Sequence, residues 1–220
     1  MPIEESQILY PNETQEYREA RQALIEDETE LLAKVKEVAA KRRALPLGGR
    51  IPSDYSFVWA DDTRLNQPAS ISALFGEQDT LLLYCLMYGP NWEKACPSCT
   101  SLVDGFDRMA RHVEHDAAFA VIGKASAEKL NALAKRQKWT EINLVSGLDS
   151  TFHTDYKCQG DTADKQLAVM HVFKKVDGII HHFWATEGIE NDLDMVWPYW
   201  NLMDMTPAGR PDRDDPPETT

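Results

Sequence analysis

The chain has 220 residues, of which 43% are hydrophobic and 27% are charged. This length suits one domain with appendages, and the composition supplies enough apolar side chains for a core, which excludes a wholly disordered protein. The 23 basic and 36 acidic residues give a net charge of −13. Because an acidic surface repels phosphate, we expect no nucleic-acid partner.

The sequence favours a soluble protein. No apolar run reaches the ~18 residues that a membrane span requires, and the longest covers residues 81–88. Residues 1–6 carry two acids and neither a basic start nor an apolar stretch, so we expect no secretory signal and a reducing, cytoplasmic location. The four cysteines are therefore expected to be buried, metal-binding or redox-active: Cys85, Cys96, Cys99 and Cys158.

Residues 12–43 contain no Gly or Pro and predict one long amphipathic helix. Its apolar side chains recur at spacings of three, four and seven residues: Ala20, Leu24, Leu31, Val35 and Val38. Glu residues are frequent in its first half and basic residues close it, which matches the helix dipole. The apolar stripe fits packing against its own domain, or a homodimer contact.

Strands and helices alternate in the middle of the chain. Apolar or β-rich runs predict strands over residues 55–60, 81–88, 117–122 and 142–145, with helices over residues 96–115 and 126–138. Residues 167–173 and 179–184 flank Asp177-Gly178, which is typical of a hairpin turn. A last helix is expected from about Glu190. This order predicts an α/β fold with a mixed sheet flanked by helices.

We expect three parts along the chain. Residues 1–50 form an N-terminal helical extension, and residues 51–205 form the α/β domain. Residues 206–220 are rich in Pro and Asp and have few apolar side chains to bury, so we expect a disordered tail.

The clearest chemical signal is Cys96-Pro97-Ser98-Cys99, which follows the apolar strand and a loop and opens a predicted helix. A thiol at a helix N-terminus faces unpaired backbone N–H groups, which lower its pKa from ~8.5. We expect Cys96 to be the nucleophile and Cys99 to resolve a mixed disulfide formed on it. The predicted function is a thiol-disulfide oxidoreductase without a bound cofactor, acting on a thiol or disulfide substrate with an external reductant. The alternative is a non-catalytic binding or scaffold protein on the same fold.

These motifs also resemble a known family. The motifs that carry the resemblance begin at Tyr55, and the resemblance itself covers nearly the whole chain, including the long first helix. It rests on the Cys pair and on Leu74-Phe75-Gly76, residues 80–88, Gly89-Pro90-Asn91-Trp92, Trp200-Asn201-Leu202 and Thr206-Pro207-Ala208-Gly209-Arg210. The family is an uncharacterised bacterial one of thioredoxin-like proteins, similar in outline to the alkyl hydroperoxide reductase and thiol-specific antioxidant (peroxiredoxin-like) branch. The resemblance implies a thioredoxin-like fold and says less about activity.

Two departures from the related families affect the expected chemistry. Thioredoxins place a cis-proline before the strand that faces the Cys pair, which here is near Gln166 or Leu167, but no proline lies between residues 97 and 198. We therefore expect an altered docking loop and weak activity on generic protein disulfides. Peroxiredoxins place Thr three residues before the reactive Cys, whereas Glu93 precedes Cys96 here, so a typical peroxidase site is not expected.

The other cysteines and the histidines have simpler expected roles. Zinc bound by the Cys96–Cys99 pair would need two more ligands, and the nearest candidates are Cys158 and the hairpin histidines His171, His181 and His182. The last two point to opposite faces of a strand, so at most one could join. We expect no metal, with a Cys/His site as the minor alternative. Cys85 is expected to be a small buried side chain, and Cys158 an exposed thiol or a second resolving one.

The sequence leaves the roles of three aromatic groups undecided. We expect Trp92 to shield the thiolate, to form a docking surface or to cover the helix end. The C-terminal aromatic residues fit a core or interface better than a ligand cage: Trp184, Trp197, Tyr199 and Trp200. A further set either faces the Cys pair or forms an ordinary helical turn: Phe152, His153, Asp155 and Tyr156.

Overall fold

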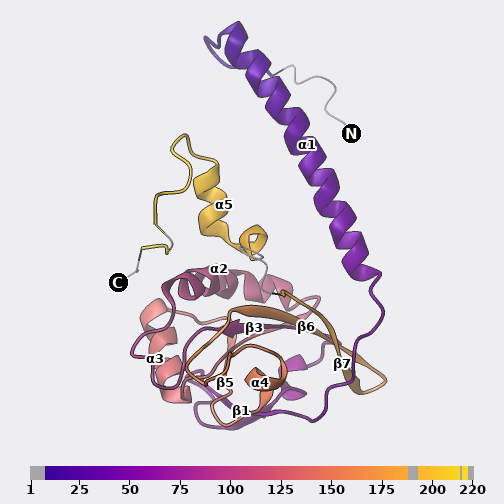
Figure 1. Ribbon diagram of the computed structural model, residues 1–220, viewed down its shortest axis with the longest axis vertical. Coiled ribbons are helices and arrows are strands. Elements are labelled where there is room, and N and C mark those ends of the chain that lie inside the picture. Colours follow the sequence, from indigo (N-terminus) through magenta and orange to yellow (C-terminus); the bar gives the residue numbers. More distant parts are fainter. Residues whose placement is uncertain (1–7, 188–192, 214, 218–220) are drawn as a thin grey trace. The chain divides into compact units, whose positions relative to one another are not determined.

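The computed structural model describes residues 8–187, 193–213 and 215–217. It divides the chain into two units, Met1–Pro46 and Leu47–Thr220 (Figure 1). The first unit contains helix α1, Gln15–Arg43, which confirms the long N-terminal helix. Thr14 caps it, since its Oγ1 accepts the N–H of Tyr17 at 3.2 Å. None of the helices in the described residues has the length and apolarity needed to cross a membrane.

Within the described part of the second unit, seven strands form one mixed sheet in the order β2-β1-β5-β4-β3-β6-β7. The strands are β1 Ser56–Trp59, β2 Pro68–Ser70, β3 Thr80–Leu86, β4 Ala118–Gly123, β5 Asn143–Ser146, β6 Val169–Val176 and β7 Ile179–Ala185. The pairs β3–β4 and β4–β5 are parallel and the others antiparallel. Asp177 and Gly178 both have positive φ at the β6–β7 turn, as the hairpin prediction requires.

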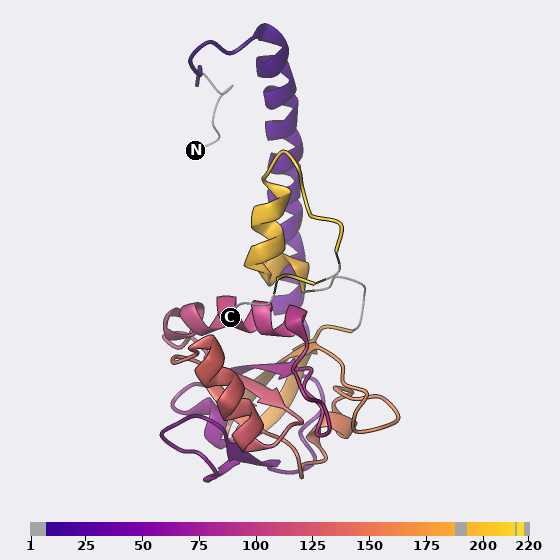
Figure 2. The ribbon, with the colours of Figure 1, turned by 90° about the vertical axis from the view of Figure 1, so that its left-hand side faces the viewer.

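Helices cover the sheet on both faces. The connections between parallel strands are α2, Pro97–Val113, and α3, Ala127–Gln137 (Figures 1 and 2). A short helix α4, Phe152–Asp155, follows β5, and α5, Pro198–Asp204, lies near the C-terminus. Two 3₁₀ turns, η1 Ala73–Phe75 and η2 Asp194–Val196, complete the described elements. The helix start expected at Glu190 lies outside the described residues.

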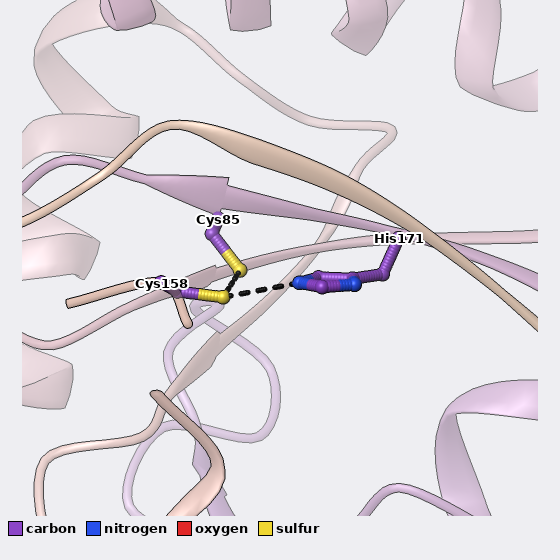
Figure 3. Close-up of side chains that lie close together, drawn as sticks. All are labelled: Cys85, Cys158 and His171. Atoms are coloured by element: carbon purple, nitrogen blue, oxygen red, sulfur yellow. Dashed lines mark hydrogen bonds between the residues drawn. The ribbon is translucent and has the colours of Figure 1, made fainter. Parts of the chain in front are cut away.

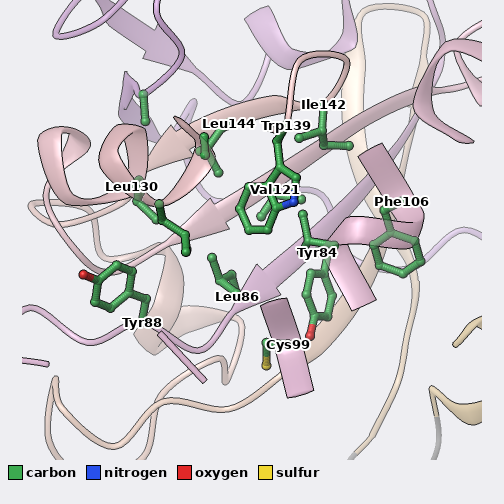
Figure 4. Close-up of a cluster of buried hydrophobic side chains, with 14 of the residues drawn as sticks. Tyr84, Leu86, Tyr88, Cys99, Phe106, Val121, Leu130, Trp139, Ile142 and Leu144 are labelled. Carbon is green, nitrogen blue, oxygen red and sulfur yellow. The ribbon is translucent and has the colours of Figure 1, made fainter. Parts of the chain in front are cut away.

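The sheet separates two apolar clusters, and successive residues of β3 alternate between them. Tyr84 and Leu86 join the cluster formed with α2 and α3, which also contains Cys99 (Figure 4). Leu83 and Cys85 join the cluster on the other face, which contains Phe152 from α4. Cys85 and Cys99 therefore belong to opposite sides of the same central sheet.

A buried carboxylate fixes α2 to the chain that enters β5. Asp107 is 2% exposed, and its Oδ1 accepts backbone N–H groups of Thr140 at 2.9 Å, Glu141 at 2.9 Å and Ile142 at 3.1 Å. These amides lie just before β5 and have no neighbouring strand to bond among the described residues. The Asp107 carboxylate therefore accepts the hydrogen bonds that a neighbouring strand would otherwise accept. Asp107 thus holds the helix whose first turn carries the Cys pair.

Candidate redox site

The first turn of α2 carries the Cys96-Pro97-Ser98-Cys99 sequence. A loop leads from β3 to this turn and is closed by the N–H of Cys96, which donates to the carbonyl of Met87 at 3.0 Å. Cys96 is the N-cap of α2, and its Sγ accepts the N–H of Cys99 at 3.5 Å. Pro97 occupies the first helical position, where a missing N–H costs no hydrogen bond. The structure therefore places the Cys96 sulfur where the helix has unpaired donors.

The two sulfurs have opposite electrostatic surroundings. The pKa of Cys96 is lowered to about 7, chiefly because the Cys99 thiol donates to its sulfur, with help from the backbone N–H groups of Cys99 and Ser98 and against the effect of burial. Cys99 is 3% exposed, and its pKa is raised well above the ordinary value because it gives its proton to Cys96 and is buried. At neutral pH the half-buried sulfur is partly a thiolate, while the buried one is a thiol.

A cavity of about 560 Å³ borders Cys99. Its lining includes Tyr84, Met87, Ala168 and Trp197. The Tyr84 hydroxyl is buried and, among the described residues, has no partner with hydrogen-bond geometry, but it lies beside Cys99 closely enough to lower the pKa of that thiol in part (Figure 4). The buried thiol therefore lies at the wall of a cavity.

The segment before β6 faces this cavity through Ala168, as the thioredoxin-like arrangement implies. None of the peptide bonds between described residues is cis. The segment is held by a backbone hydrogen bond from Leu167 N–H to the carbonyl of Cys158 at 2.9 Å, and Leu167 itself is 42% exposed. Ala168 therefore borders the candidate site, and the backbone before it is trans.

Trp92 anchors the loop between β3 and α2. Its Nε1 donates to the carbonyl of Asp164 at 2.9 Å, and Asn91 donates to the Asp164 carboxylate from its backbone N at 3.1 Å and its Nδ2 at 2.7 Å. A Cβ at Gly89 would lie 2.7 Å from the Trp92 ring, so this close packing needs glycine. Trp92 also packs against the core cluster of α2, and so joins the loop to both neighbouring segments.

The C-terminal segment packs against α2. Trp197 Nε1 donates to Ser101 Oγ at 3.3 Å, and the Ser98 hydroxyl donates to the carboxylate of Asp215. Trp200 is 5% exposed and contacts the rings of Trp197 and Tyr199, with centroids 5.8 and 4.7 Å away. Trp200 is thus a buried core side chain, one of the arrangements expected for this group, whereas Trp197 and Tyr199 are half-buried.

Asp215 is expected to oppose the activation of Cys96, because its negative charge raises the pKa of the Cys96 thiol. Replacing Asp215 by Asn should lower the pKa of Cys96 further and speed its alkylation at pH 6 by roughly twofold. High salt screens the Asp215 charge in the wild type and should make the difference between the two proteins smaller. The measurement is the rate of alkylation by iodoacetamide against pH. Asp212→Asn changes the same segment and serves as the control. An unchanged midpoint in Asp215→Asn would contradict this electrostatic role.

The sequence predicts Cys158 to be an exposed thiol in a polar loop or a second resolving thiol, and the predicted exposure is wrong. Its side chain is fully buried in the cluster that contains Cys85. The reason is its backbone, since its N–H donates to the carbonyl of His153 at 2.8 Å and its carbonyl accepts from Leu167, which turns the side chain inward. Cys158 and His171 do come together, but they meet Cys85 on the other face of the sheet from the Cys96–Cys99 pair (Figure 3).

The hairpin histidines point to different sides, as expected. His182 contacts His171, with 3.2 Å between their Nε2 and Nδ1 atoms, whereas His181 contacts the carbonyl of Gly48 at 3.1 Å. Phe152, His153 and Asp155 form the short helix α4, which settles the open choice for that segment in favour of a helical turn.

His153 is completely buried, and neither ring nitrogen has a hydrogen-bond partner among the described residues. Burial lowers its pKa to about 3, with a further contribution from the charge of Lys124. Between pH 6.5 and about 3, the unfolded chain therefore binds a proton at this histidine that the folded protein does not bind. The free energy of unfolding is therefore unaffected by His153 above pH 6.5, and it decreases as the pH falls from 6.5 toward about 3.

Replacing His153 by Phe is expected to leave stability at pH 7 unchanged or higher, because an unpaired polar ring is exchanged for an apolar one. The loss of stability between pH 6.5 and 5 should become smaller, by up to about 1.4 kcal/mol per pH unit. Urea unfolding at both pH values measures this. The exposed His112, replaced by Gln, is the control; identical pH profiles for His153→Phe and the wild type would show that His153 does not titrate as described.

This sheet, with a Cys pair at the start of the helix that follows strand β3, defines a thioredoxin-like α/β fold. Among solved structures, AhpC of Enterococcus faecalis has a TM-score of 0.50 at 8% identity, covering 71% of this chain and 90% of its own. Peroxiredoxin Q of Xanthomonas campestris has a TM-score of 0.49 at 13% identity, over 70% and 96% of the two chains. Peroxidoxin BcpB from Mycobacterium tuberculosis has a TM-score of 0.48 at 15% identity, over 69% and 91%.

At such low identity, the match to the Enterococcus protein shows the fold and not the chemistry. The chain belongs to the family described as bacterial protein of unknown function (DUF899), which matches residues 8–219. A search of curated proteins finds no match.

Proposed function

We propose that the protein is a thiol-disulfide oxidoreductase in which Cys96 is the nucleophile and Cys99 the resolving thiol. The observation that carries this proposal is the pairing of a half-buried sulfur at a helix N-cap, with a pKa of about 7, with a buried thiol of raised pKa in the same turn. Burial makes Cys99 a poor first nucleophile. Its position in the same helical turn places it next to the Cys96 sulfur, which it must attack.

The proposed cycle transfers two electrons from the Cys pair to a disulfide. The Cys96 thiolate attacks one sulfur of the substrate, forms a mixed disulfide and releases the other sulfur as a thiolate. Cys99 then loses its proton to solvent or to the departing thiolate and attacks the Cys96 sulfur. The second half of the substrate leaves as a thiol, and the Cys96–Cys99 disulfide remains. An external dithiol reductant returns both electrons and restores the two thiols.

The test is to measure the reactivity and the oxidation of the pair in the intact protein. Alkylation of Cys96 should have a midpoint near pH 7, and Cys99 should react much more slowly at every pH. After mild oxidation, mass spectrometry should show a loss of two hydrogens in the peptide that contains both residues. Equal and slow alkylation of the two residues would favour the non-catalytic binding or scaffold alternative.

The proposed substrate is a small disulfide or a dedicated partner in preference to generic protein disulfides. The segment before β6 lacks proline, and Leu167 uses its N–H to bond Cys158, so this amide is not available to pair with an extended substrate chain. We expect reduction of a small aromatic disulfide at a rate about fivefold above that of insulin at equal concentration, since the lost backbone contact weakens docking of the protein substrate by about 1 kcal/mol. Insulin turnover as fast as that of the small disulfide would contradict this preference.

A further inference from the structure

A second group of sulfur and nitrogen atoms lies on the face of the sheet opposite α2. The Sγ atoms of Cys85 and Cys158 are 2.7 Å apart, and Nε2 of His171 is 3.2 Å from the Cys158 sulfur. The imidazole points directly at the two sulfurs (Figure 3). Cys85 lies in β3, Cys158 in the loop that follows α4, and His171 in β6. The tertiary fold, and not a local motif, therefore brings them together.

These three groups have the burial and the chemistry of a metal site. Cys85, Cys158 and His171 are 1%, 0% and 3% exposed, and their possible ligand atoms all lie within 4.8 Å of one another. Thiolates and imidazole are the ligands that zinc prefers in proteins. The other nitrogen of the ring, Nδ1, is 3.2 Å from Nε2 of His182. Such an outer partner fixes the orientation of a ligating histidine and directs its free nitrogen at the metal.

We propose that Cys85, Cys158 and His171 bind a zinc ion through their two Sγ atoms and Nε2. Binding releases the two thiol protons to solvent, and the two thiolates then balance the double charge of the ion, so the occupied site is neutral and compatible with the apolar cluster around it. Zinc bonds of ~2.3 Å to sulfur and ~2.0 Å to nitrogen put tetrahedral ligands roughly 3.5–3.8 Å apart. The sulfurs, now 2.7 Å apart, must therefore separate by about 1 Å on binding.

Access and the fourth ligand come from a separate cavity of about 660 Å³. His171 and His182 line it, together with Tyr156 and Met87. A three-ligand zinc site leaves one position for water, and this cavity is the route by which water reaches it. Met87 and Ala168 also line the cavity beside Cys99, so the two sites adjoin without sharing a thiol.

A simple disulfide between Cys85 and Cys158 is the chemical alternative. It would use both sulfurs, but it would give no role to an imidazole held against one of them and braced by His182 on its far side. The zinc site uses all of these contacts. It would also hold the backbone of Cys158, whose carbonyl anchors Leu167, the residue before Ala168 in the cavity that borders Cys99.

The experiment is metal analysis of the full-length protein produced with zinc and purified under reducing conditions. We expect one zinc ion per chain in the wild type and in the double variant Cys96→Ser/Cys99→Ser, and its loss in Cys158→Ala and His171→Gln. His181→Gln, the neighbouring hairpin histidine with a different partner, is the matched control and should keep the metal. Circular dichroism establishes that each variant is folded.

A second measurement leaves the proposed ligands unchanged. Cobalt(II) added to the reduced Cys96→Ser/Cys99→Ser protein should give thiolate-to-cobalt charge-transfer absorption and visible bands typical of tetrahedral coordination, which zinc then removes. Zinc that disappears with the Cys96–Cys99 pair would overturn the proposal, as would reduced, folded protein that takes up neither metal. The proposal would also be overturned if protein purified without added oxidant stably contained a Cys85–Cys158 disulfide, because the two sulfurs would then form the simple disulfide described above.

Discussion

Replacement of Cys96 by Ser is expected to reduce disulfide reduction to the rate of the external reductant alone. A serine hydroxyl is not ionised at neutral pH, so the helix N-terminus has no thiolate to activate. The loss should be on the order of 1,000-fold or more, as for other nucleophiles removed from a catalytic pair. The assay follows reduction of a small disulfide with a dithiol as electron donor. Met109→Ala, an exposed change on the same helix, is the control.

The complementary variant Cys99→Ser should keep the first step and lose the second. Its mixed disulfide on Cys96 should accumulate and be visible by mass spectrometry, because no neighbouring thiol resolves it. Turnover that survives in Cys96→Ser would assign the chemistry to another residue.

Replacement of Asp107 by Ala is expected to cause the largest loss of stability among single changes near the site. Three backbone N–H groups at the entrance to β5, of which that of Ile142 is buried, would lose their common carboxylate acceptor, at a cost of about 3–5 kcal/mol. Asp107→Asn keeps an oxygen at the same place and should lose distinctly less. Guanidinium unfolding with an unchanged m-value measures the difference. Equal stability of the two variants would show that these hydrogen bonds are not essential.

The main elements of the fold could be predicted because their signals are local. The apolar run of β3, the Ser126 cap of α3 and the Asp-Gly turn of the hairpin each require only neighbouring residues. Strand β2 was missed because it has three residues and begins with Pro68, which breaks the usual pattern of a strand. The length and alternation of the apolar runs nevertheless determined the class of the sheet.

The candidate site divides in the same way. The place of Cys96 at a helix start is a local property and could be predicted from the sequence. The contacts of Ser98 with Asp215, and of Cys85 with Cys158, join residues 117 and 73 positions apart, which no short motif encodes. The polarity of the loop around Cys158 even suggested exposure, although two backbone hydrogen bonds turn this side chain into the core.

The identity of the N-cap has a consequence for the dynamics of the protein. Most helices begin at a side chain whose oxygen is chemically inert, whereas the first turn of α2 is closed by a sulfur that the proposed reaction oxidises and then reduces again. In a disulfide this sulfur carries no negative charge and accepts the Cys99 N–H only weakly. Local opening of the first turn should then require less free energy, and the amide hydrogens there should exchange faster with solvent. The oxidised and reduced proteins would thus differ in the order of one helical turn while sharing the same sheet.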